Sequence, residues 1–194
     1  MKPSSEIDYR IRKLKPEEIH LVRGIDRSEE IRAEYVCAPA ADGLGLRLSR
    51  RELDTPRVEA NWGDQELASR CALWAENVND GAAMFGAFRG EELIGFCIVA
   101  RLDDSRTSEL YSIFVDRRSR GQGVGKALLC RAERQSMEWG CEEMVLYTDT
   151  GHAAATVEFY LARRYRVVGI QDTAVKSKNF PLTMAKRLGG RAAR

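Results

Sequence analysis

The sequence has few of the residues that build metal sites and disulfide frameworks. Its 194 residues include 2 histidines and 5 cysteines, the cysteines are widely spaced, and no Cys-x-x-Cys pair occurs. A structural zinc site needs four such ligands in close groups, so we expect no metal. An odd number of scattered cysteines also argues against a disulfide framework and favours free thiols in a reducing cytoplasm.

The sequence also lacks a strong excess of charge and a long apolar run. Its formal net charge is +2, which gives no global field suited to nucleic acid or an anionic membrane. A nucleic-acid-binding domain built on the arginine clusters at 117–120 and 163–166 is therefore the weakest of three function classes. No segment approaches the roughly 20 apolar residues that span a bilayer, and residues 1–6 contain no apolar core for export. We expect a cytoplasmic protein that binds neither nucleic acid nor membrane.

Apolar periodicity predicts a single mixed α/β domain over residues 7–188, between short tails at 1–6 and 189–194. The content of 44% hydrophobic and 31% charged residues is ordinary for a globular chain of this length. Residues 33–50 suggest a hairpin, or paired extended segments, around Pro39 to Gly43. Strands are predicted over Asp8–Lys13, Met84–Phe88, Leu93–Leu102, Ser108–Val115, Met144–Thr148, Arg166–Ile170 and Leu182–Leu188. Helices are predicted from Pro16 and over Asp64–Asn79, Gln122–Trp139 and Thr156–Arg163, with Asp64 as an N-cap.

The most informative stretch is a basic, glycine-rich loop between the strand that ends at Val115 and the helix that follows. Gly121, Gly123 and Gly125 lie in this loop. Free backbone N–H groups at a helix N-terminus carry about half a positive charge and bind phosphates. Glycines let a pyrophosphate approach the main chain closely, and Arg120 and Lys126 add side-chain charge at the rim. The loop therefore predicts a phosphate-bearing ligand.

Three phosphate-binding patterns compete for this loop. The P-loop requires Ser or Thr after Gly-Lys, where this chain has Ala127. The dinucleotide fingerprint requires a third glycine where Lys126 stands. The pattern Arg-x-x-Gly-x-Gly is satisfied in full from Arg120 to Gly125. The sequence thus favours the third pattern.

This third pattern, with its strand before and helix after, resembles the acetyl-CoA loop of the GNAT family of N-acetyltransferases. The resemblance extends over roughly residues 7–188 and is strongest from Met84 to Tyr165. It implies an α/β fold whose mixed central sheet has a splayed pair of parallel strands and is flanked by helices. It also implies that acetyl-CoA is the co-substrate. The implied contacts are Ile113, Phe114, Val115, Arg120, Gly121, Gln122, Gly123, Val124, Gly125, Lys126, Ala127 and Tyr160.

Acetyl transfer to an amine requires a base, because an alkylammonium has a pKa near 10. Glu109 lies six residues before Val115, the spacing of a strand glutamate that is the base in one branch of the family. Strand alternation would place Glu109, Tyr111 and Ile113 on one face. The competing interpretation is that Glu109 ends a strand in solvent. His152, which follows a strand together with Asp149, is an alternative base.

The transfer also requires a donor for the oxyanion and a proton for the departing thiolate. The resemblance implies that the main-chain N–H of Ile113 is the oxyanion donor and that a bulge lies near Phe114 or Val115. Tyr160 is the candidate acid, since Phe159 to Tyr165 resembles the family's Phe-Tyr-x-x-x-Gly-Phe segment. A packed core aromatic is the alternative role.

Two residues near Tyr160 depart from the family pattern. Arg164 replaces the glycine, which predicts a turn without positive φ. Ala153 replaces an asparagine that usually bonds the coenzyme.

The acceptor is the least determined part of the prediction. The acidic groups of the variable region would attract a cationic amine, or they form a solvated face. A polyamine, an aminoglycoside-like antibiotic and a protein amine all stay open, as does a homodimer. The predicted reaction is direct transfer from acetyl-CoA to a primary amine, and the alternative is a catalytically weak acyl-CoA-binding module. The acceptor candidates are Asp26, Glu29, Glu30, Glu34, Tyr35 and Trp62.

Overall fold

The computed structural model describes residues 8–41, 45–103, 105–171 and 180–189. The chain forms two compact units. The first unit includes the chain up to Arg27 and resumes from Asn61 to Glu142. The second contains Ser28–Ala60 and the chain from Glu143 onward. The predicted domain limits at residues 7 and 188 stay predictions.

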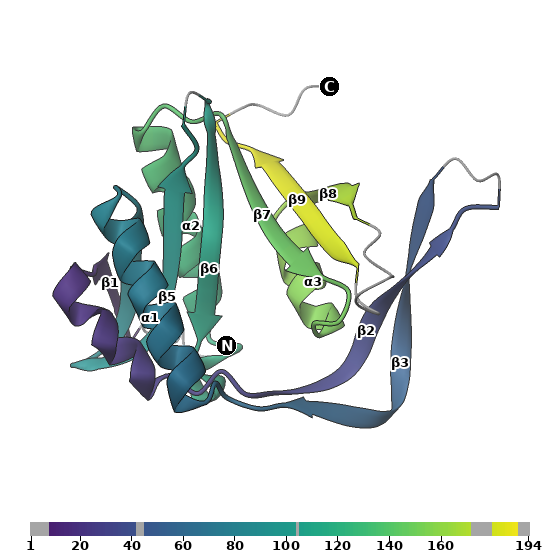
Figure 1. Ribbon diagram of the computed structural model, residues 1–194, viewed down its shortest axis with the longest axis horizontal. Helices are drawn as coiled ribbons and strands as arrows, with labels where there is room; N and C mark the ends of the chain where they lie inside the picture. The colour runs from purple at the N-terminus through teal and green to yellow at the C-terminus, as the bar shows by residue number, and fades with distance from the viewer. Residues whose placement is uncertain (1–7, 42–44, 104, 172–179, 190–194) are drawn as a thin grey trace, which may run out of the picture. The chain divides into compact units, whose positions relative to one another are not determined.

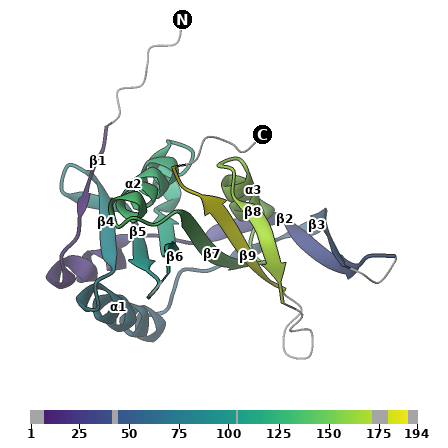
Figure 2. The same ribbon diagram turned by 90° about the horizontal axis from the view of Figure 1, so that it is seen from above.

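The first unit is built on four antiparallel strands in the order β1-β4-β5-β6. A 3-10 helix, η1 (Pro16–Gly24), and the helices α1 (Asp64–Asn79) and α2 (Val124–Glu138) accompany them. Figure 2 shows α2 on one side of these strands and α1 on the other. The strands are β1 (Arg10–Lys13), β4 (Ala83–Arg89), β5 (Glu92–Arg101) and β6 (Thr107–Val115).

Both faces of β4 and β5 are covered, which explains why these strands read as unbroken apolar runs. Phe96 and Ile98 belong to a buried cluster with Trp74 of α1 and Ile19 of η1. Cys97 points to the opposite face, where its thiol lies 3.5 Å from the Leu128 carbonyl of α2. Because side chains alternate along a strand, each of these strands contributes to two separate cores, one on each face of the sheet.

The second unit contains the strands β7 (Glu143–Asp149), β9 (Pro181–Arg187) and β8 (Arg166–Ile170), paired antiparallel in that order. The helix α3 (Ala154–Leu161) belongs to it. So does a long hairpin of β2 (Glu29–Pro39) and β3 (Leu46–Glu59), which Figure 1 shows as an extended ribbon. This hairpin confirms the prediction for residues 33–50, although 42–44 of its turn lie outside the described residues.

A β-bulge interrupts β6, but not where it was predicted. The register with β5 shifts between Ile98/Ser112 and Val99/Leu110, so Tyr111 is the extra residue. Phe114 and Val115 instead pair regularly with Phe96 and Gly95. The expected bulge near Phe114 or Val115 is therefore wrong.

The bulge also changes which residues of β6 share a face. Glu109 pairs with Ala100, which packs against the Trp74 cluster. Ile113 pairs with Cys97, whose thiol faces α2. Directly paired residues share a face of the sheet, so Glu109 and Ile113 lie on opposite faces. The prediction that they share one is wrong, because an inserted residue shifts the alternation by one position.

Arg164 has a φ of +68°, which contradicts the prediction of a turn without positive φ. The Tyr165 N–H donates to the Tyr160 carbonyl, and the Arg164 N–H donates to the Leu161 carbonyl. These two bonds form the Schellman motif that ends α3, and the motif requires a left-handed residue after the helix. Tertiary placement of Tyr165, which is 1% exposed, enforces this turn on an unfavourable residue.

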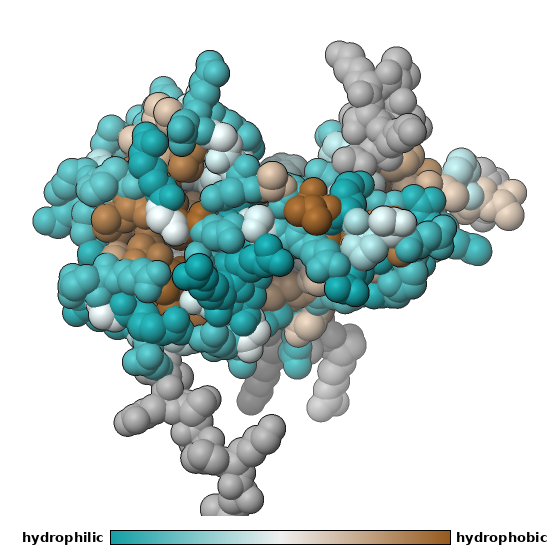
Figure 3. Space-filling view, turned by 90° about the horizontal axis from the view of Figure 1, so that it is seen from below, coloured by the Kyte–Doolittle hydropathy of each residue, from teal (hydrophilic) through white to brown (hydrophobic). Residues whose placement is uncertain are grey.

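Most other predicted elements match the observed ones to within a few residues. The hairpin is longer than predicted, since β3 continues to Glu59, and the helix predicted from Pro16 is a 3-10 helix. One small correction concerns α1, which is capped by Gly63, with Asp64 in the first turn. Among the described residues, no helix is long and apolar enough to cross a membrane. On the face drawn in Figure 3, hydrophilic side chains predominate, with hydrophobic residues in smaller areas between them.

Candidate functional site: a phosphate loop and a histidine pocket

The loop before α2 has the geometry of an anion cradle. Gly121 and Gly123 have φ of +75° and +84°, and Gly123 is the N-cap of α2. A Cβ added at Gly121 would meet nothing within 4 Å, so its surface is open to a ligand. The first N–H groups of a 15-residue helix are available beside it. These residues fit a pyrophosphate, as the sequence predicted.

The Asp116 carboxylate holds the start of the loop by hydrogen bonds. Its Oδ1 accepts the Arg118 N–H at 2.9 Å, and its Oδ2 accepts the Asp26 N–H at 2.9 Å. The Asp26 carbonyl in turn accepts the Arg117 N–H at 2.8 Å. A segment far away in the sequence therefore holds the loop in place through reciprocal bonds. This role of Asp116 could not be predicted from the sequence, since no local pattern marks a partner 90 residues away.

The predicted role of the Arg120 side chain is only partly supported. Its guanidinium donates to the Val115 carbonyl at 3.1 Å and to the Arg27 carbonyl at 2.7 Å. Those bonds hold the guanidinium against the protein backbone. Arg120 therefore contributes positive charge near the loop, but its N–H groups are already used in part by these two carbonyls. Gln122 accepts from Arg89 at 2.7 Å, while Lys126 in the first turn of α2 is exposed.

Glu109 is half-buried on β6, two residues before the bulge. Burial raises the pKa of its carboxyl above the ordinary value. No hydrogen bond or ion pair of this side chain is found within the part of the chain that the structure describes. A carboxylate that is poorly solvated and has no cation beside it is more basic than one in water. The environment of Glu109 is therefore consistent with the predicted role as a general base.

The predicted coenzyme contacts on β6 differ in where their side chains lie. The Phe114 ring lies 4.8 Å from Trp62 and 5.5 Å from Phe96. This side chain belongs to the α1 core, so any contact to coenzyme from Phe114 would come from its backbone. Ile113 stands opposite Cys97 on the other face.

Tyr160 lies on α3 in the second unit and is 7% exposed. Its ring packs edge-on against Tyr165 at 5.7 Å and against Phe159 at 5.1 Å. This surrounding agrees with a packing role and leaves the predicted role of the hydroxyl as a proposal.

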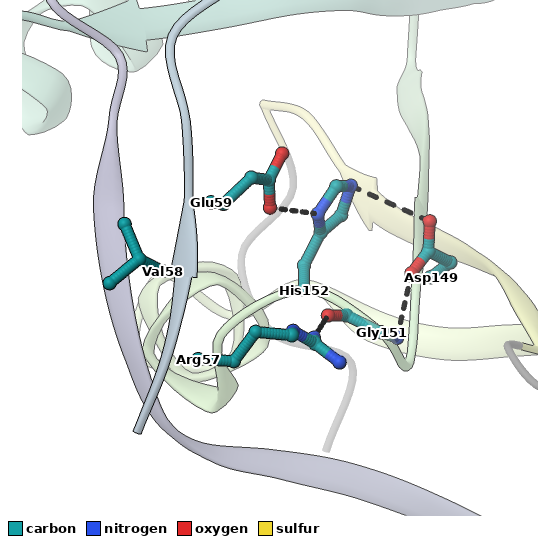
Figure 4. A pocket seen from close by; sticks show the side chains of 6 residues that line it. All are labelled: Arg57, Val58, Glu59, Asp149, Gly151 and His152. Atoms are coloured by element: carbon teal, nitrogen blue, oxygen red, sulfur yellow. Dashed lines mark hydrogen bonds and ion pairs between the residues drawn. The ribbon is translucent and has the colours of Figure 1, made fainter. Parts of the chain in front are cut away.

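The second unit also contains a pocket of ≈ 320 Å³ in which His152 is central (Figure 4). The imidazole Nε2 lies 3.5 Å from Asp149 Oδ2, and Nδ1 lies 3.9 Å from Glu59 Oε2. Arg57 completes the charged lining by donating to the Gly151 carbonyl. The sequence indicated His152 and Asp149 but missed Arg57 and Glu59. Both of these residues lie on β3, and Arg57 is 94 residues away from Gly151 in the sequence, so no local pattern links them to this turn.

Several acidic residues predicted for the acceptor are engaged elsewhere. Glu34, 9% exposed, pairs with Arg51 and Arg57. Glu30 pairs with Arg32 at 2.7 Å, and Asp26 serves the loop. The guanidinium groups of Arg27 and Arg70 lie 4.9 Å and 4.8 Å from the centre of the Trp62 ring. These contacts favour structural roles over direct recognition. No group of three or more acidic, histidine or cysteine ligands suited to a metal occurs in the ranges that the structure describes.

A family model for the acetyltransferase (GNAT) family matches residues 48–164, which is more than half of the chain. The chain belongs to the GNAT acetyltransferase family. The match begins in β3 and ends at Arg164, so it includes the loop of Gly121 and Gly123, the His152 pocket and Tyr160.

Two curated relatives of this GNAT protein are mycothiol acetyltransferases. The one from Streptomyces scabiei is 35% identical over 80 residues, which cover 41% of this chain and 26% of the relative. The one from Gordonia bronchialis is 27% identical over 128 residues, which cover 66% and 41% respectively. The chain therefore spans less than half the length of these relatives.

Solved structures extend the likeness over nearly the whole GNAT chain. Nourseothricin acetyltransferase superposes with a TM-score of 0.75 at 20% identity, covering 93% of this chain and 98% of that one. A PaiA N-acetyltransferase from Thermoplasma acidophilum in complex with coenzyme A gives 0.58 at 18% identity, covering 92% and 98%. At such identities the likeness shows the fold, and it confirms the predicted α/β fold of the GNAT type.

Proposed function

We propose that this protein is an acetyl-CoA-dependent N-acetyltransferase that moves an acetyl group directly to a primary amine. The observation that carries the proposal is the open, left-handed glycine loop at the N-terminus of α2, in a chain of the GNAT family. Acetyl-CoA supplies an activated thioester, and the loop N–H groups, with Lys126 nearby, hold its pyrophosphate.

The proposed chemical roles fall on three residues. Glu109, with its raised pKa, takes the proton from the amine, directly or through water, and the Ile113 N–H donates to the oxyanion. Tyr160 returns a proton to the thiolate. The C–N bond forms first and gives the oxyanion, whose collapse breaks the C–S bond and releases the thiolate, so atoms balance without a metal or an acyl-enzyme.

The similar proteins are named for different acceptors, namely mycothiol and nourseothricin. They support an amine acceptor and leave its identity to experiment. The proposed cytoplasmic setting is supported by the odd number and wide spacing of the cysteines in the sequence. The mass of the protein in solution tests the proposed homodimer.

The test is thiol release from acetyl-CoA in the presence of polyamines, aminoglycosides and lysine peptides. We expect amine-dependent release in the intact protein and none in Gly123→Asp, which places a strained residue and a negative charge in the cradle. Acetyl-CoA binding without release for any amine would instead support the acyl-CoA-binding module.

A further inference from the structure

We propose that the His152 pocket of the second unit binds the acceptor, and that the acceptor is a primary ammonium not accompanied by a carboxylate. This inference rests on the proposed function and names the substrate class of that reaction. It is argued from the geometry of a pocket whose lining residues all lie outside the acetyl-CoA loop.

The pocket is held open by fixed backbone rather than by loose side chains. The Gly151 N–H donates to Asp149 Oδ1 at 2.7 Å, which folds the turn back on its own carboxylate. The Arg57 guanidinium donates to the Gly151 carbonyl and so joins this turn to strand β3. Gly151 is buried, while the His152 side chain is 42% accessible. The turn is thus anchored, and its imidazole is presented to a ligand.

The charges around the pocket favour a cation. Two carboxylates, Asp149 and Glu59, flank the His152 ring from opposite sides (Figure 4). The single guanidinium, Arg57, is committed to the Gly151 carbonyl and lies 3.6 Å from Glu34, which also pairs with Arg51. Val58 contributes little to recognition, because Figure 4 shows its side chain pointing away from the ring.

A primary ammonium matches the charge of this pocket. It has three N–H donors, and the pocket presents the carboxylates of Asp149 and Glu59 on either side of the His152 ring. A carboxylate near the amine would meet Asp149 and Glu59, and like charges at that range repel. The pocket therefore selects amines by the charge of their surroundings.

The experiment compares putrescine, butylamine and γ-aminobutyrate, which share one carbon chain and differ only in the charge at the far end. At saturating acetyl-CoA, we expect KM to rise from putrescine to butylamine to γ-aminobutyrate. Glu59→Gln and Asp149→Asn should each raise KM for putrescine about tenfold or more, since each removes one charged acceptor. The KM for acetyl-CoA should stay unchanged.

Glu52→Gln is the matched control, since Glu52 lies on the same strand, pairs with Arg50 and does not line the pocket. It should leave every KM unchanged, and melting curves check that all variants fold. Turnover with an unchanged putrescine KM in both pocket variants would overturn this inference while the proposed function stands. If acetyl-CoA binds and no amine is turned over, the proposed function fails. Calorimetric titration with putrescine then tests the pocket by itself. Binding that Glu59→Gln weakens would support the inference, and no binding to the intact protein would overturn it.

Discussion

Arg164 illustrates how a single residue can be held in a conformation that its own chemistry disfavours. Its φ of +68° is in the left-handed region, which costs a residue with a side chain about 1–2 kcal/mol. The cost is borne because the Schellman bonds end α3 and allow Tyr165 to bury its ring. The hydroxyl of that ring lies 3.0 Å from the Met144 sulfur, which ties the turn to β7.

Arg164→Gly should therefore stabilise the protein. Glycine removes the energetic cost of the left-handed conformation. Its greater conformational entropy in the unfolded state offsets part of this stabilisation. We expect a net gain of about 0.5–1 kcal/mol, or roughly 1–4 °C in Tm, in thermal melting. Ala162→Gly, two residues earlier at a right-handed position, is the control and should lower Tm. A lower Tm for Arg164→Gly would mean that the Arg164 side chain makes a stabilising contact.

Glu109→Gln should separate catalysis from stability. If Glu109 is the base, kcat should fall roughly 10²–10⁴-fold with little change in acetyl-CoA affinity. The wild-type rate should fall as pH drops through the pKa of Glu109, which burial holds above the ordinary carboxyl value. The variant should lack that acidic limb. A normal kcat and pH profile would transfer the role to His152, and His152→Ala would test it.

The same raised pKa has the opposite consequence for folding. The native state binds the Glu109 proton more tightly than the unfolded state does. Stability from this group is therefore present at low pH and is lost as pH rises through the native pKa. Denaturant unfolding at neutral pH should accordingly show Glu109→Gln to be more stable than the wild type. Equal stability at neutral pH would indicate that burial does not perturb this carboxyl.

Tyr160→Phe distinguishes a proton donor from a packed ring. The change keeps the ring contacts to Tyr165 and Phe159, so the melting temperature should change little. If the hydroxyl protonates the thiolate, turnover should fall by about one to three orders of magnitude. Tyr160→Ala should cost roughly 3–5 kcal/mol of stability in either case. Normal turnover of Tyr160→Phe at saturating substrates would end the acid assignment.

At the level of elements, the glycine loop depends on a segment outside itself. Asp116 accepts N–H groups from Asp26 and Arg118, so Asp116→Ala leaves two donors without their acceptor. We expect acetyl-CoA to bind about tenfold more weakly, with a stability loss of about 1–2 kcal/mol. Calorimetric titration and melting measure both. Asp116→Asn keeps one acceptor oxygen and should be intermediate, and wild-type affinity in Asp116→Ala would show that the loop holds its shape alone.

At the level of the whole molecule, acetyl-CoA binding should raise stability by mass action. A hundredfold excess over Kd adds about 2.7 kcal/mol to the free energy of unfolding if the ligand binds the native state only. Thermal melting with and without acetyl-CoA measures this shift. A folded Gly123→Asp variant should show none, and an unchanged shift would remove the loop from the binding site.

Much of this protein follows from local pattern. The apolar periods of β4, β5 and α1 and the Arg120 to Gly125 motif specify their elements, because each is decided by residues close together in the sequence. The match to the GNAT family confirms the fold and family predicted from that motif. The predicted catalytic roles of Glu109 and Tyr160 stay predictions.

The sequence by itself determined the elements, the family and the glycine loop. Tertiary structure alone decided the bulge at Tyr111, the left-handed Arg164, the Asp116–Asp26 bonds and the charged pocket around His152. Each of these depends on partners that lie far apart in the chain or on packing that overrides local preference. Register and long-range hydrogen bonds have no short sequence period, which is why periodicity could not reveal them.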